Sequence, residues 1–163
     1  MSTLVIGVDP GLTTGLMALR FDNDRLAADP IAVQIHGPAG VLPFVHSLLA
    51  KPDADARPAL IAVEQFVVGG RATRSRYPNA GKATRDLVAA LQDLNRLPLV
   101  GEVAVRPAAT VKPWATDHRL EAAGLLEACA GMGHARDAAR HALYAAVRSG
   151  IGTDPLSKAA MNR

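Results

Sequence analysis

Apolar runs alternate along the chain with polar breaks rich in glycine and proline, and their spacing predicts strands first and helices later. Residues 3–8 are β-branched and apolar, which is typical of a strand buried on both faces. Gly15, together with the Pro-Gly pair at residues 10–11, predicts a tight turn, and residues 14–21 predict the returning strand of a hairpin. Residues 31–35 alternate apolar and polar positions, so we expect three antiparallel strands to open the fold.

The rest of the chain predicts helices that alternate with buried strands, and therefore an α/β domain. We expect helices over residues 41–50, 79–96, 118–130 and 134–148, and strands over residues 60–63 and 100–105. Thr110 predicts the cap of a short helical turn that contains Lys112. No periodicity continues beyond residue 150, which predicts one domain over residues 1–150 and a flexible tail over residues 151–163.

The composition agrees with one domain and weakly favours an anionic partner. A chain of 163 residues with 49% hydrophobic residues can build one full core. Because there is neither a leader-like start nor an apolar run near ~18 residues, we expect a soluble, cytoplasmic protein with no membrane partner. The net charge of +3 is by itself only weak evidence for an anionic partner.

Positive charge is concentrated in one glycine-containing segment. Between Gln65 and Arg85 there is no acid, and five basic residues lie in or end this stretch: Arg71, Arg74, Arg76, Lys82 and Arg85. The segment is either a solvated surface loop or a loop that follows a phosphate backbone, for which the arginine fork is well suited.

Two apolar strands end on a carboxylate, Asp9 and Glu64. The carboxyl ends of neighbouring parallel strands meet at one sheet edge, so the two acids converge if their strands are neighbours. His134 and Asp137 are three apart and therefore share one face of the last predicted helix. Each has a simpler explanation, as a turn acid, a surface residue or an acid that favours the helix dipole. Together the four side chains suit Mg²⁺ or Mn²⁺.

Three short motifs resemble the RuvC-type Holliday-junction resolvases of the RNase H-like superfamily. They are Ile-Gly-Val-Asp-Pro-Gly at residues 6–11, Val-Glu-Gln at residues 63–65 and His-Ala-Arg-Asp-Ala-Ala at residues 134–139. The resemblance spans roughly residues 5–147. It implies an RNase H-like, five-stranded mixed sheet in the order 3-2-1-4-5, flanked by helices, in a bacterial or phage-encoded protein.

The resemblance also implies an activity: a homodimeric, metal-dependent endonuclease that nicks two strands of a four-way DNA junction. By position, Asp9, Glu64, His134 and Asp137 look like the metal ligands, and Lys112 falls where the family carries a functional lysine. The helix over residues 83–94 is expected at the dimer interface, and the basic segment is expected to hold DNA arms.

Two cations about 3.5–4 Å apart, bridged by one carboxylate, suit phosphodiester hydrolysis, and Asp9 is the expected bridge. His141, one turn beyond Asp137, is interpreted as a packing or supporting residue and not as a ligand. Two departures from the family bear on specificity. His134 stands where bacterial members commonly have Asp, which leaves the metal preference open. Val67 stands where an aromatic residue is usual, and Phe66 precedes it.

Other functions remain open on the sequence. A ribonuclease or RNA-processing relative would have the same fold and acids. Sugar kinases and actin-like ATPases open with an Asp-x-Gly-Thr-Thr hairpin, which residues 12–15 of this chain resemble, but they need two such domains around a nucleotide. A non-catalytic junction binder would not need the complete acid set.

Overall fold

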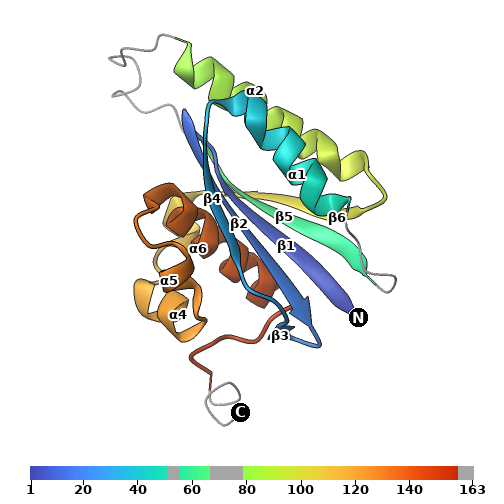
Figure 1. Ribbon diagram of the computed structural model, residues 1–163, viewed down its shortest axis with the longest axis vertical. Helices are drawn as coiled ribbons and strands as arrows, with labels where there is room; N and C mark the ends of the chain where they lie inside the picture. Colours follow the sequence, from blue (N-terminus) through green and yellow to red (C-terminus); the bar gives the residue numbers. More distant parts are fainter. Residues whose placement is uncertain (51–55, 67–78, 158–163) are drawn as a thin grey trace.

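A mixed six-stranded sheet forms the centre of the computed structural model, which describes residues 1–50, 56–66 and 79–157 (Figure 1). The strands are β1 (Ser2–Asp9), β2 (Thr13–Asp22), β3 (Arg25–Leu26), β4 (Ile31–His36), β5 (Arg57–Glu64) and β6 (Val100–Arg106). β2 is antiparallel to β1, β3 and β4, whereas β5 is parallel to β1 and β6. The predicted order 3-2-1-4-5 is confirmed as β4-β2-β1-β5-β6, and the two-residue β3 pairs additionally with β2.

Helices cover both faces of the sheet. They are α1 (Val41–Leu49), α2 (Ala80–Asp93), α3 (Ala108–Val111), α4 (Asp117–Ala122), α5 (Leu125–Ala128) and α6 (Gly133–Arg148). α1 and α2 pack on one face, and α4, α5 and α6 pack on the other (Figure 1). Among the described residues, no helix is both long and apolar enough to cross a bilayer.

Side-chain alternation divides each central strand between two cores. On β1, Ile6 and Val8 face the core beneath α1 and α2, whereas Val5 faces α6. On β5, Ile61 and Val63 face the core beneath α1 and α2, whereas Leu60 and Ala62 face α6. The terminal acids of both strands therefore share the parity of the α6 face.

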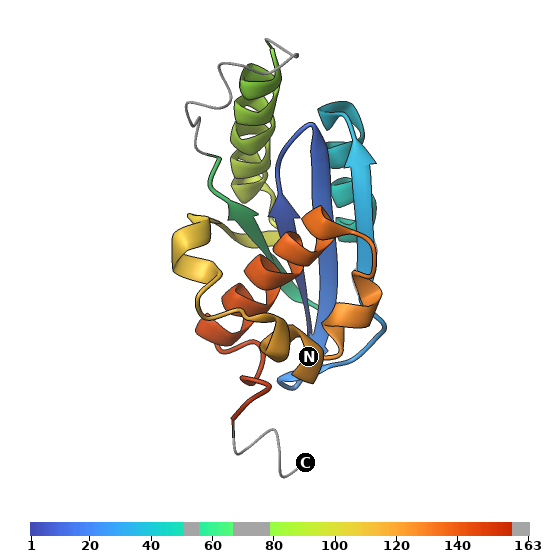
Figure 2. The same ribbon diagram turned by 90° about the vertical axis from the view of Figure 1, so that its left-hand side faces the viewer.

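Two glycines let α6 lie directly against the sheet, across β1 and β2 (Figure 2). A Cβ atom on Gly7 would stand 2.0 Å from the carbonyl oxygen of Ala138, and a Cβ on Gly15 would stand 2.0 Å from the carbonyl carbon and oxygen of His134. The expectation that Gly15 belongs to the turn is wrong: it lies in β2, paired with Asp9, where it admits the helix backbone.

Two helix predictions also need correction. The helix expected over residues 118–130 is divided into α4 and α5, because Gly124 adopts a left-handed conformation with φ of +71°. The Thr116 side chain caps α4 by accepting the N–H of Arg119. Thr110 lies inside α3 and does not cap it, since Pro107 takes the N-cap position; Lys112 follows at the C-cap.

The described part of the predicted tail makes specific contacts with the domain. Arg119 donates from Nε and Nη2 to the two carboxylate oxygens of Asp154, at 3.0 and 3.1 Å. The Thr153 hydroxyl donates to Asp24 at 2.7 Å. Residues 158–163 lie outside the described residues.

The Arg119–Asp154 pair gives a testable contribution to stability. Hydrogen bonds from Arg119 hold the pKa of Asp154 below its usual value. Because the pKa of the folded state is the lower one, the stabilisation is complete above the ordinary aspartate pKa and is lost as pH falls through the folded value. We expect Asp154→Asn to lower the free energy of unfolding by about 1 kcal/mol at pH 7, since the pair is partly exposed and water screens it.

Urea titrations at pH 7 and at pH 3 measure this difference. The control Asp29→Asn changes an exposed carboxylate before β4 and should leave the midpoint unchanged. Equal loss at both pH values would show that the Asp154 charge is not what stabilises the tail.

Candidate active site

The sheet register brings the two strand-end acids side by side. β1 and β5 pair in parallel up to Val8 and Val63, so Asp9 and Glu64 are the next residues on neighbouring strands. The same row continues outward, with Arg106 paired to Glu64 on one side and Gly15 paired to Asp9 on the other. The predicted convergence of the two acids at one sheet edge is therefore present in the structure.

His134 and Asp137 of α6, which were predicted for the site, lie beside this row of residues. His134 Nδ1 lies 2.7 Å from Asp9 Oδ2. The start of the helix is held by β4, because the Gln34 side-chain oxygen accepts the His134 backbone N–H at 2.9 Å. Gln34 pairs with Gly15 in the sheet, so its side chain stands next to the space that the glycine leaves for the helix.

Two cations hold Asp137. Lys112 Nζ donates to Asp137 Oδ2 at 2.9 Å and also lies 3.7 Å from Glu64 Oε2. Arg140 donates from Nη1 to Asp137 Oδ1, from Nη2 to Asp117 and from Nε to the Ala115 carbonyl. The predicted Lys112 is thus part of the acid cluster, and Arg140 fixes the Asp137 side chain from its other side.

His141 contacts the cluster from the buried interior of the protein. Its side chain is 1% exposed, and its Nε2 lies 3.2 Å from Glu64 Oε2. The ring is buried on α6 beside Ala138 and Ala142. It contacts the candidate site without lining the groove described below.

Burial and neighbouring charges shift the pKa values of both strand-end acids. Burial raises the pKa of Asp9 above its usual value, and the His134 contact only partly offsets this effect. Glu64 behaves in the opposite way: the His141 ring lowers its pKa despite partial burial. Because burial disfavours the ionised form of Asp9, this is the acid that a further cation nearby would stabilise most.

The lysine and the helix acid stabilise one another. Burial acts to raise the pKa of Asp137, but Lys112 and Arg140 outweigh it and the pKa is lowered. Burial alone would lower the pKa of Lys112, yet Asp137 and Glu64 raise it. Both groups therefore carry their charges at neutral pH.

Asp9 and Glu64 line a groove of about 430 Å³ at the carboxyl ends of β1, β5 and β6. Its lining consists of Asp9, Pro10, Glu64, Gln65, Phe66, Pro107, Ala108 and Ala109. Gln65 and Phe66 also line a neighbouring hollow of about 260 Å³, together with Arg85 and Val88 of α2. Val67, which was expected to replace an aromatic residue, lies outside the described residues.

Only part of the predicted basic segment can be placed. Arg71, Arg74 and Arg76 lie outside the described residues. Lys82 is exposed on α2 and pairs with Asp86 at 2.6 Å. Arg85 is exposed one turn further along and lines the hollow beside Phe66.

The donor set fits a divalent cation chemically, although the observed side-chain positions do not yet form a metal-binding cluster. Among the described residues, no group of three histidine, cysteine or acidic side chains is close enough to hold an ion. However, Asp9, Glu64 and Asp137 face the two cations Lys112 and Arg140, so the cluster keeps a negative charge when its histidines are neutral. Oxygen and imidazole donors of this kind suit Mg²⁺ and Mn²⁺.

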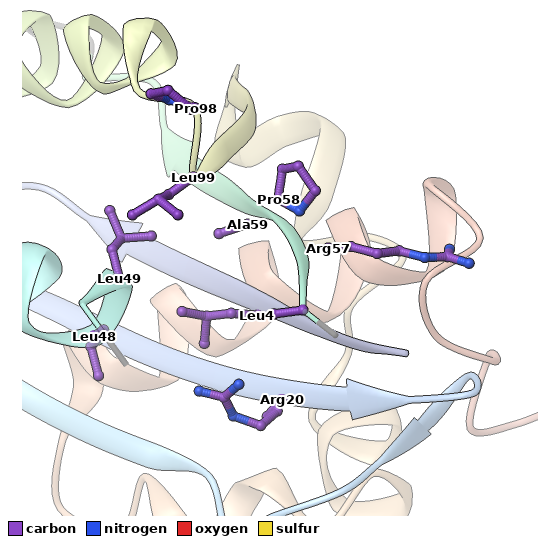
Figure 3. A pocket seen from close by; sticks show the side chains of 10 residues that line it. Leu4, Arg20, Leu48, Leu49, Arg57, Pro58, Ala59, Pro98 and Leu99 are labelled. Atoms are coloured by element: carbon purple, nitrogen blue, oxygen red, sulfur yellow. The ribbon is translucent and has the colours of Figure 1, made fainter. Parts of the chain in front are cut away.

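Another pocket lies at the opposite end of the sheet and has a different character (Figure 3). Leu4, Leu49 and Leu99 gather there, while the Arg57 side chain points away from them. None of the predicted site residues lines it. The carboxylate groove is therefore the better candidate for catalysis.

Three residues of the site were not predicted from the sequence. Arg140 has a weak signal, because it follows Asp137 by three positions on a helix. Gln34 and Asp117 have none, since their contacts join segments far apart in the chain. Compared with protein families and with curated proteins, the chain matches none of them. The geometry of the site is thus the basis for a functional conclusion.

Proposed function

We propose that this chain is a metal-dependent, structure-selective endonuclease of the RuvC type, which resolves four-way and related branched DNA. One observation carries the proposal: two strand-end carboxylates and the His134/Asp137 face of α6 converge beside one open groove. The topology of the sheet is that expected for an RNase H-like domain.

Asp9, Glu64, His134 and Asp137 are the residues that would hold the metal ions. When bound there, two divalent ions would supply an activated water and would stabilise the leaving oxygen of the phosphodiester. The chain itself orients these donors. His134 contacts the Asp9 carboxylate, while Lys112 and Arg140 donate hydrogen bonds to Asp137. Lys112 is charged and 39% exposed, and in this proposal it would contact a phosphate oxygen of a bound strand.

The surroundings of the groove suit a nucleic-acid strand. Arg85 of α2 lines the hollow next to the groove. The basic segment before it would supply further phosphate contacts. Such contacts position a backbone without reading its sequence. Because one chain offers one site and resolution requires two cuts, we propose a homodimer in which α2 contributes to the interface.

A panel of substrates tests the proposed activity. Four-way DNA, a flap, a linear duplex and an RNA/DNA hybrid are incubated side by side with Mg²⁺ or with Mn²⁺. We expect cleavage of four-way DNA to be the fastest. Cleavage of the RNA strand of the hybrid alone would make the protein a ribonuclease, and binding without cleavage would make it a junction binder.

The contribution of Arg85 to DNA binding can be measured through salt dependence. Each lost phosphate contact reduces the slope of log K against log salt by about 0.9 on duplex DNA. We expect Arg85→Ala to weaken junction binding and to reduce the slope by about that amount. The matched control is Arg25→Ala, since Arg25 is exposed on β3 at the far end of β2 from the groove. An equal slope in both variants would remove Arg85 from the DNA-binding surface.

A further inference from the structure

His141 is a polar side chain in a place where apolar residues are expected. It lies on α6 between Ala138 and Ala142, which are both fully buried, and its own side chain is 1% exposed. Burying an imidazole costs free energy unless a polar partner compensates for the lost water. The contact that His141 makes therefore needs a reason beyond packing.

That contact is with one oxygen of Glu64. His141 Nε2 and Glu64 Oε2 are 3.2 Å apart and both atoms are buried. Among the described residues neither atom makes a hydrogen bond of regular geometry, not even with the other, so each is the nearest polar group available to satisfy its neighbour. The other nitrogen near this oxygen is Lys112 Nζ, at 3.7 Å, but Lys112 is more exposed and donates to Asp137 at 2.9 Å. His141 is thus the closer and more rigidly packed of the two neighbours of Glu64 Oε2.

His141 contacts one strand-end acid in the same way that His134 contacts the other. His134, Asp137 and His141 follow one another at intervals of three and four, so they form one stripe on α6. His134 contacts Asp9 and His141 contacts Glu64, while Asp137 lies between the two histidines on the helix. Each strand-end acid of the site therefore meets a histidine of the same helix face.

The two histidines differ in exposure. The His134 side chain is 52% exposed at the start of the helix, so a ligand in solvent can reach it. His141 has no such access to solvent, since the helix and the sheet enclose it. A ring that is enclosed in this way can orient its neighbour but cannot reach a ligand in the groove.

We propose that His141 is a positioning residue for Glu64. Its Nε2–H faces Glu64 Oε2 and holds the carboxylate in one orientation, so that the other oxygen is the one available to a cation in the groove. The inference rests on the proposed function, because it assigns Glu64 to a metal site. Hydrogen-bonded partners of ligating carboxylates commonly affect metal affinity in this way.

Mn²⁺ binding, measured by calorimetry without nucleic acid, tests the inference apart from activity. We expect His141→Leu to weaken Mn²⁺ binding by roughly 10- to 100-fold. His141→Gln keeps an N–H donor at a similar reach and should recover most of that loss. Leu143→Ala removes a buried side chain from the same helix and should lower thermal stability while leaving Mn²⁺ affinity unchanged.

Nuclear magnetic resonance of ¹⁵N-labelled histidine tests the contact itself at one fixed pH. We expect His141 to carry a proton on Nε2, and its resonance to move in Glu64→Gln but not in Glu102→Gln, which changes an exposed acid on β6. A proton found only on Nδ1, or unchanged Mn²⁺ affinity in His141→Leu, would overturn the inference. If the wild type binds no Mn²⁺, the metal part of the proposed function fails, and the resonance experiment alone decides whether His141 holds Glu64.

Discussion

Asp9→Asn should abolish most DNA cleavage while leaving junction binding nearly intact. The substitution hardly changes the side-chain volume, but it removes the charge of the most buried acid at the groove, whose side chain is 13% exposed. Loss of a preorganised charge at a reacting centre typically costs about 10²- to 10³-fold in rate. Binding should stay within about threefold, because contacts to the phosphate backbone supply most of the affinity.

Band-shift and nicking assays on one labelled junction measure both quantities. Asp29→Asn is the matched control, since Asp29 is an exposed acid before β4 that lies outside the groove, the acid cluster and α2. The control should cleave at the wild-type rate. Cleavage by Asp9→Asn within a few-fold of wild type would exclude Asp9 from the mechanism.

Gly15→Ala should both destabilise the domain and disable the site. The added Cβ would stand 2.0 Å from the His134 carbonyl, so either the strand or the start of α6 has to move. Overpacking against a backbone costs about 3 kcal/mol, and for a domain of this size this lowers the melting temperature by about 10 °C. A shift of about 1 Å at His134 is enough to reduce cleavage about 100-fold even where the protein remains folded.

Gly133→Ala is the matched control, one residue before His134 in the same helix. No atom lies within 4 Å of the position where its Cβ would be, so this alanine should be neutral or slightly stabilising. Melting curves and cleavage rates at 20 °C compare the two variants. Wild-type stability in Gly15→Ala would contradict the close packing of α6 on β2.

The sheet and the acid pair could be predicted because both depend on local patterns. Apolar residues that alternate or run without interruption define the strands, and the acids at residues 9 and 64 end two of them. Their side chains share the face that Val5 and Leu60 present to α6, which follows from the two-residue period of a strand. The spacing of His134 and Asp137 placed them on one helix face in the same way.

The remaining details depend on tertiary contacts that no local pattern encodes. Gly15 is in a strand and not in the turn, because a helix from the other end of the chain packs against it. Gln34 binds the backbone of a residue 100 positions away, and Arg140 joins α6 to Asp117. The contacts of Asp154 with Arg119 likewise join segments that are separate in sequence.

The proposed function depends on paired cutting at a branch point, which a supercoiled plasmid with an extruded inverted repeat tests most directly. Two coordinated nicks across the four-way junction at the base of the cruciform convert such a plasmid to linear DNA, whereas a single nick gives an open circle. Relaxed plasmid of the same sequence has no junction and serves as the control. A homodimer with one site per chain should cut both strands before it dissociates.

We predict that the wild type, with Mg²⁺ or Mn²⁺, gives linear DNA cut at the cruciform, and that Asp9→Asn gives none. The relaxed plasmid should remain intact. Equal cutting of the relaxed and supercoiled plasmids, or no cutting of either by a protein that cleaves an RNA/DNA hybrid, would contradict the assignment of this chain as a junction resolvase.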